Sequence, residues 1–217
     1  MAALIPGKSF GEEPGTIAKR KVTFSLRVGV QIPTQPVDEA GETFVTSIVG
    51  QPAEAKGDAG FRAGGTVAID LSQRTSLGLA LEWSRMGLTA PGTNLGDMNT
   101  FTALPYILFH PKGRSEKRTY YLTGGLGAHL NWLHFAHPED CVWGAASGCN
   151  AKPYAAVAFR VGAGGEAAIS PKTRLSLELN WTLNMGSLEG DIDGIPLPKD
   201  GLNLSAVMFL AGVRFEP

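Results

Sequence analysis

Hydrophobic and polar residues alternate along several segments of this chain. Over residues 21–32, every second position is apolar, from Val22 to Ile32, and the positions between carry Lys, Thr, Ser, Arg, Gly and Gln. Successive side chains of a β-strand point to opposite faces, so this pattern predicts a strand with one apolar and one polar face. The same alternation recurs over residues 60–71, 75–85, 120–133, 155–169 and 174–184.

Two further segments, residues 100–109 and 202–215, are apolar on both faces in places, and the first contains Pro105. Proline has no N–H to donate and is uncommon in a fully paired strand. Their length and position along the chain nevertheless fit strands. The sequence therefore predicts eight strands, with the facing of these two left open.

The polar faces of the predicted strands combine small glycines with large charged side chains. This combination suits a narrow β-barrel whose interior is filled by side chains, and buried charges there need partners of opposite sign. The apolar faces would then meet either lipid or a second sheet. The candidate interior charge network consists of Arg27, Arg62, Asp70, Glu82, Arg160, Glu166, Arg174 and Glu178, with Arg214 as a further candidate.

The connections between the predicted strands differ in length. Outer-membrane barrels keep short turns on the periplasmic side and long loops outside. We therefore expect an all-β, eight-stranded antiparallel up-and-down transmembrane β-barrel over residues 19–217, after an N-terminal periplasmic extension over residues 1–18, with both termini periplasmic. The long connections are residues 33–59, 134–153 and 185–201, and the shorter ones are residues 72–74, 87–99, 110–118 and 170–172.

Aromatic residues on the apolar faces favour a membrane. Trp83, Trp132 and Trp181 are expected at the long-loop end of their strands, and Tyr120 and Phe215 near the opposite end. Amphipathic rings collect at membrane interfaces, so these five residues form a candidate interface girdle. A soluble β-sandwich or a lipocalin-like barrel is the alternative.

Composition fits this class without proving it. The 217 residues carry a net charge of -1, with 28 glycines and only 18% charged residues, and give no reason to expect nucleic acid as a partner. No apolar run reaches the ~20 residues of a membrane helix. An outer-membrane protein needs an export signal with an apolar core, and residues 1–10 contain no such core. We expect that this sequence is a processed or recombinant form.

The long connections hold the candidates for other chemistry. Cys141 and Cys149 are predicted to form a local disulfide, with free thiols as the alternative. For two polar clusters a solvated loop is favoured over metal binding, and no metal or cofactor is expected. The clusters are His134, His137, Glu139 and Asp140, and the acidic group Glu189, Asp191, Asp193 and Asp200.

A catalytic site is not expected. His129 is predicted to face the interior as a hydrogen-bonding residue, and no serine, histidine and carboxylate gather on the lipid side. Arg85 lies one step beyond Trp83 on the same face, at the outer headgroup level. It is a candidate contact for lipopolysaccharide phosphate, with a neutral snorkelling role as the alternative.

The segments FTALPYILFH, RTYYLTGGLGAHL, VAFRVGAGGEAAIS, TRLSLELNW and AVMFLAGVRF carry a family resemblance. Through them residues 19–217 resemble the OmpA/OmpX-like small outer-membrane β-barrels, which implies the same fold. Members of that family end in an aromatic residue, whereas here Glu216 and Pro217 follow Phe215.

The function expected from these features is noncatalytic. The chain would act as a structural anchor or loop-mediated binding scaffold, or as a subunit of a larger envelope complex. Its partners would be membrane lipid, lipopolysaccharide, and envelope proteins met through the loops or the N-terminal segment. A narrow channel for small solutes or ions and a lipid A-modifying enzyme are the alternatives.

Overall fold

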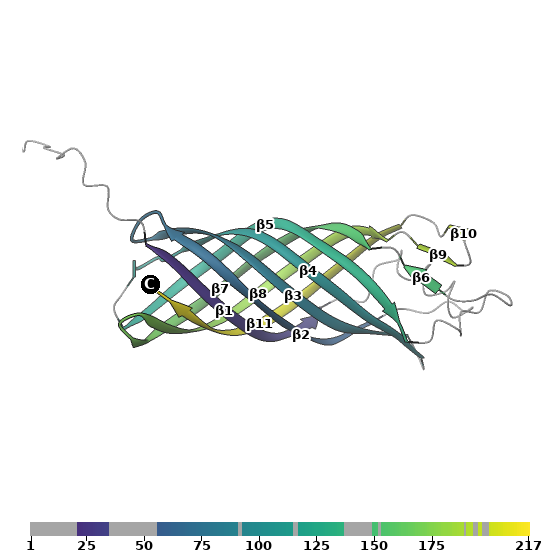
Figure 1. Cartoon of the computed structure of the whole chain (residues 1–217), viewed down its shortest axis with the longest axis horizontal. Helices are drawn as coiled ribbons and strands as arrows, with labels where there is room; N and C mark the ends of the chain where they lie inside the picture. The colour runs from purple at the N-terminus through teal and green to yellow at the C-terminus, as the bar shows by residue number, and fades with distance from the viewer. Residues whose placement is uncertain are drawn as a thin grey trace, which may run out of the picture.

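Eight long strands close into a barrel in the computed structural model of the chain (Figure 1). The structure describes residues 21–34, 56–90, 93–114, 117–136, 149–151, 153–188, 190–192, 195–196 and 200–217. In this part of the chain no helix is long and apolar enough to cross a membrane. The barrel strands are β1 (Val22–Pro33), β2 (Lys56–Asp70), β3 (Thr75–Ala90), β4 (Thr93–Phe109), β5 (Arg118–Phe135), β7 (Tyr154–Ser170), β8 (Thr173–Leu188) and β11 (Asp200–Phe215).

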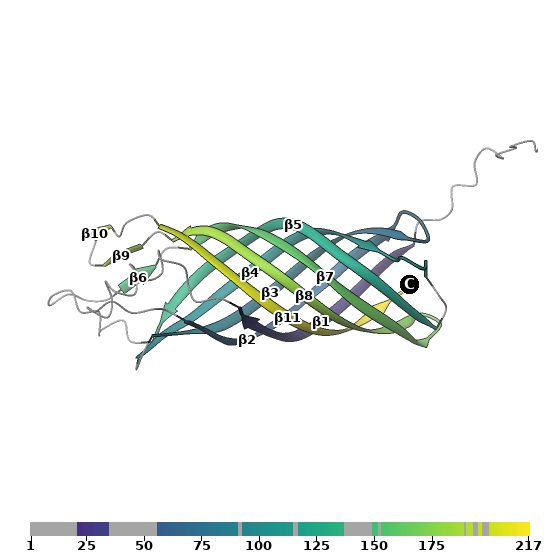
Figure 2. The same cartoon turned by 180° about the vertical axis from the view of Figure 1, so that it is seen from behind.

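Every barrel strand pairs antiparallel with its neighbours along the chain, and β1 closes the sheet against β11. The closure places Phe24 opposite Phe215. The start of β1 and the end of β11 therefore lie at the same end of the barrel, together with the connections over residues 71–74 and 171–172 (Figures 1 and 2). The predicted eight-stranded antiparallel barrel is confirmed.

The strands are longer than the sequence predicts. Seven of the eight contain 15 to 18 residues and β1 contains 12, whereas the predicted segments span 10 to 15. The largest difference concerns residues 87–99, which the sequence assigns to a connection. Residues 87–90 lie in β3 and residues 93–99 in β4, with Leu88 opposite Gly96. The prediction ended where the outward residues become polar, at Arg85 and Asn99, although strand pairing continues past that point.

A second, three-stranded sheet was not predicted. It consists of β6 (Cys149–Ala151), β9 (Gly190–Ile192) and β10 (Ile195–Pro196), and lies at the long-connection end of the barrel (Figure 2). Strands of two or three residues are too short for alternation to reveal. Cys149 pairs with Ile192 in this sheet, whereas Cys141 lies outside the described residues, so the structure gives no support to the predicted disulfide.

The outer surface of the barrel is apolar. Large hydrophobic side chains are exposed around its whole circumference, with Leu177 at 71% and Leu126 at 62% of their full exposure. Charged and polar side chains point inward. A sheet that exposes its leucines and buries its arginines is inverted relative to a water-soluble barrel, as lipid requires.

The two strands with weak alternation, β4 and β11, also place apolar side chains in the lumen. In β4, Leu104, Tyr106 and Leu108 are buried, and in β11 Met208 and Leu210 are buried. The lumen is therefore not uniformly polar, which explains why the alternation is weak in these strands.

Pro105 interrupts the pairing of β4 with β5. Pairs run from Gly96↔Phe135 to Phe109↔Leu122 with a gap only at Leu104 and Pro105, whereas pairing with β3 continues through Leu79↔Pro105. Since proline has no N–H, the carbonyl of Leu126, which the register places opposite Pro105, lacks its ladder donor.

Candidate functional site: the filled lumen and its cavity

The barrel interior is organised around one carboxylate, Glu82 of β3. Its oxygens bind Arg27 Nη2 at 2.9 Å and Arg62 Nε at 2.8 Å, and they also bind both terminal nitrogens of Arg160. These arginines come from β1, β2 and β7, so Glu82 ties together opposite walls of the barrel. Glu82 is 2% exposed, and its charge is stabilised by these partners rather than by water.

Glu178 of β8 extends this cluster. Both of its oxygens accept from Arg27 Nη1 at 3.0 Å, and they also accept from Tyr121 Oη at 2.9 Å and Asn180 Nδ2 at 2.6 Å. The guanidinium of Arg27 lies 5.9 Å from the centre of the Tyr106 ring. We call Arg27, Arg62, Glu82, Arg160 and Glu178 the central cluster.

The two tyrosines fit because glycines face them from neighbouring strands. A Cβ added at Gly78 would come within 2.5 Å of the Tyr106 ring, and one added at Gly164 would come within 2.5 Å of Tyr121. Such separations are not tolerated by real atoms, so the rings occupy the space that the missing side chains leave.

A second ionic cluster closes the short-connection end. Arg214 binds Glu166 at 2.8 Å and approaches Asp70 at 3.9 Å, and Asp70 also binds Arg114. Arg174 binds Glu216 at 3.4 Å. We call these six residues the terminal cluster, in which three guanidinium groups meet three carboxylates.

His110 joins this end to the connection after β4. Its Nε2 accepts from Arg114 Nε at 3.2 Å, and its ring packs edge-on against Tyr121 with centroids 5.9 Å apart. Burial, followed by the positive charge of Arg114, lowers the pKa of the imidazole. A neutral His110 can therefore hold Arg114 across the end of the barrel.

A cavity of about 30 Å³ lies on the other side of the central cluster, towards the long connections. Near it, Thr100 Oγ1 donates to Asn131 Oδ1 at 2.8 Å, and Asn184 Nδ2 binds the same oxygen at 2.9 Å. A volume of this size holds on the order of two water molecules. The lining residues are Gln31, Pro33, Arg62, Ser84, Met86, Met98, Thr100, His129, Thr182, Asn184, Leu204, Ser205 and Ala206.

The structure places all eight predicted charged residues inward, but in two clusters instead of one network. Asp70, Glu166 and Arg174 belong to the terminal cluster. Sequence reasoning missed Arg114 and Glu216, because neither lies in an alternating segment. It also missed the position of Tyr106 beside Arg27 in the lumen, because the strand that contains Tyr106 is apolar on both faces in places.

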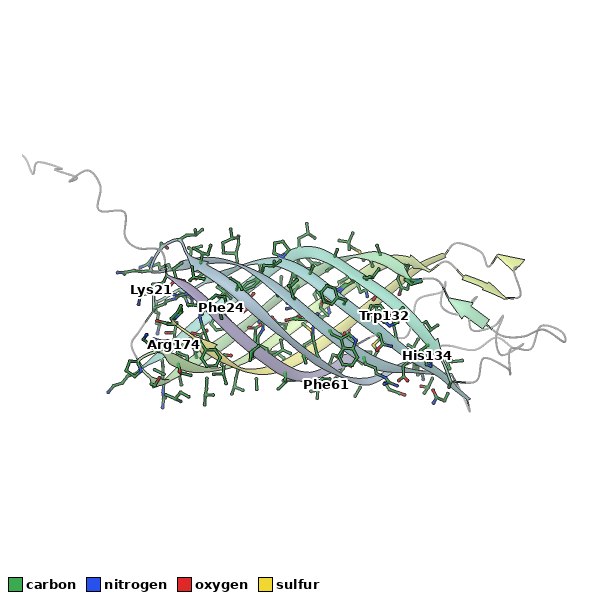
Figure 3. All side chains as sticks on the ribbon, in the orientation of Figure 1. Lys21, Phe24, Phe61, Trp132, His134 and Arg174 are labelled. Atoms are coloured by element: carbon green, nitrogen blue, oxygen red, sulfur yellow. The ribbon has the colours of Figure 1, made fainter. Side chains whose placement is uncertain are left out.

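The predicted girdle residues face outward. Figure 3 shows Trp132 near the long-connection end. Trp83 and Trp181, however, are each the ninth of sixteen strand residues and lie near mid-strand, because β3 and β8 continue further than expected. Rings of Trp83 and Phe61 meet edge-on at 6.3 Å. The girdle itself stays a prediction.

Arg85 is exposed and pairs with Asp97 across β3 and β4 at 2.5 Å. The candidate lipopolysaccharide contact thus already has a carboxylate partner. Among the residues of the two polar clusters considered for metal binding, five lie outside the described residues: His137, Glu139, Asp140, Glu189 and Asp193. His134 is exposed at the long-connection end, beside Trp132 in Figure 3.

No protein-family model matches this chain, and no curated protein matches its sequence. Solved structures do match. The outer membrane protein OprG from Pseudomonas aeruginosa aligns with a TM-score of 0.56 and 11% identity over 91% of this chain and 97% of its own. Neisserial surface protein A gives 0.53 and 12% over 90% and 97%, and the outer membrane protein AlkL gives 0.51 and 15% over 99% and 96%.

At these identities the comparisons establish the fold. The chain has the fold of the small eight-stranded outer-membrane β-barrels. This is the fold that the resemblance to OmpA/OmpX-like proteins implies. Together with the apolar outer surface, this fold supports a place in the bacterial outer membrane.

Proposed function

We propose that this protein is a closed, noncatalytic barrel that anchors its long connections at the outer surface of the outer membrane, where they bind an external ligand or an envelope partner. In this orientation the short connections and both chain ends face the periplasm. The long connections between β1 and β2, β5 and β7, and β8 and β11 then form one binding surface.

The filled lumen is the observation that carries this proposal. The central cluster joins β1, β2, β3, β7 and β8 across the interior. The terminal cluster lies nearer the short-connection end of the barrel. A barrel of eight strands has room for little beyond its own side chains. Open diffusion through the lumen is therefore not expected, and on this proposal the long connections are the part that meets a partner.

Single-channel recording in planar bilayers tests the closed lumen. The refolded chain, checked for insertion by its heat-dependent shift on gels, should give no steady openings. An unrelated open porin in the same bilayers controls for insertion. Steady, reproducible openings would favour the alternative, a narrow channel for small solutes or ions.

Two further experiments address the other parts of the proposal. Mass spectrometry of lipid A from cells with and without the protein should show no difference; a new acyl or headgroup species would favour the enzyme alternative. Protease added to intact cells should cut in the long connections and spare the chain ends. Cleavage at the ends instead would contradict the orientation.

The candidate details belong to this proposal as well. A girdle of Trp83, Trp132, Trp181, Tyr120 and Phe215 would set the depth in the membrane. It is supported by the polar outward residue Arg85, which lies two positions beyond Trp83. Lipopolysaccharide contact at Arg85 would require phosphate to compete with Asp97. Unchanged lipopolysaccharide affinity of Arg85→Ala would remove that contact.

A further inference from the structure

The central cluster has a net charge of +1, because it contains one more guanidinium group than carboxylates. Its three guanidinium groups, of Arg27, Arg62 and Arg160, meet two carboxylates, of Glu82 and Glu178. The terminal cluster is balanced, so it supplies no spare anion. A net charge in a water-poor interior is costly unless an ion of opposite sign lies nearby.

The excess charge lies next to the cavity. Arg62 lines the cavity. Among the described residues, its Nη1 has a single long contact, 3.5 Å from Gln31 Oε1, while Nε binds Glu82 and Nη2 binds Thr102 and Glu82. Arg27 and Arg160 do not line the cavity. Of the three arginines, Arg62 is therefore the one that presents a donor to this space.

His129 presents a second donor. Thr102 Oγ1 accepts from Arg62 Nη2 at 2.9 Å and lies 2.8 Å from His129 Nδ1, to which it can donate its own proton. A neutral imidazole that accepts at Nδ1 carries its proton on Nε2. His129 is 2% exposed, lines the cavity, and its Nε2 has no partner among the described residues.

We propose that this cavity binds a small monovalent anion such as chloride, held between the Arg62 guanidinium and the Nε2–H of His129. The anion neutralises the central cluster and satisfies the unpartnered donor. The cavity, of about 30 Å³, has room for a monatomic anion.

Chloride binding is measured on the full chain in lipid nanodiscs by ³⁵Cl NMR line broadening, with empty nanodiscs as baseline. Chloride added to a sulfate buffer should give saturable broadening that bromide displaces. His129→Phe should lose the saturable part. The matched control, His134→Phe, replaces an exposed histidine of the same strand and should keep it.

Linear broadening in the wild-type chain would mean that the cavity holds water only, and would overturn the proposal. Saturable broadening retained by His129→Phe would overturn it too. Should that variant not fold, the His129 side-chain NH resonance of the wild-type chain decides instead. It should shift when chloride replaces sulfate, and an unchanged resonance would contradict the site.

Discussion

Glu82 shows why single residues matter in this lumen. Three arginines from three different strands converge on its two oxygens, and all three are buried. Removal of the carboxylate would leave positive charges buried side by side. A buried ion pair that loses one partner is destabilised far more than an exposed one.

Glu82→Gln should lower the free energy of unfolding by about 3–5 kcal/mol, because the neutral amide cannot offset the three guanidinium charges. Urea unfolding in lipid vesicles, followed by tryptophan fluorescence, measures the change. Asp97→Asn breaks the exposed pair with Arg85 and should leave stability almost unchanged. Equal effects of the two substitutions would refute the structural role of Glu82.

Strands are where the sequence is most informative. Alternation identifies six of the eight because one face of each meets lipid and the other meets polar side chains, as in β1 and β8. The other two, β4 and β11, are predicted from their length and position along the chain. Alternation fails where that contrast is lost. The loop-side ends of β3 and β4 pair outside the apolar band, and the interior of β4 is itself apolar at Leu104 and Leu108.

The candidate site is only partly visible in the sequence. Periodicity assigns Arg27, Arg62 and Glu82 to the lumen, but it does not say which arginine meets which carboxylate. Those partners depend on the stagger between strands. Arg114 reaches Asp70 from a connection, where side-chain direction follows no period. The cavity and its unpartnered His129 nitrogen arise only from packing.

Gly164→Ala tests the fit between tyrosines and glycines. The added methyl would overlap the Tyr121 ring and displace its hydroxyl from Glu178, which should destabilise the barrel by about 1–3 kcal/mol. Gly124→Ala is the matched control, since a Cβ there meets nothing within 4 Å. It should be neutral or slightly stabilising. A loss of stability in both variants would point to a general effect of glycine instead.

Pro105→Val tests the gap between β4 and β5. Valine favours a strand, keeps the outward face apolar, and restores the N–H opposite the Leu126 carbonyl, so stability should rise by about 0.5–1.5 kcal/mol. Amide hydrogen exchange should show the new valine N–H protected. Rapid exchange at that position would mean that the gap has a cause other than the missing donor.

At the scale of the whole molecule, two surfaces with opposite requirements share one sheet. The outer surface is stable only in lipid, because it exposes leucine, valine and phenylalanine around the circumference. The inner surface is stable only when its charges are paired, which links the strands across the lumen. Together these features describe a membrane barrel whose strands are linked to one another through paired charges in the lumen.

The most direct test of this inverted arrangement is a methyl NMR experiment on the refolded chain in nanodiscs, recording contacts between leucine methyls and lipid acyl chains. Leu26, Leu126 and Leu177 should show strong lipid contacts, whereas Leu104 and Leu210 should show none. Lipid contacts at Leu104 and Leu210, with the first three leucines silent, would contradict the account.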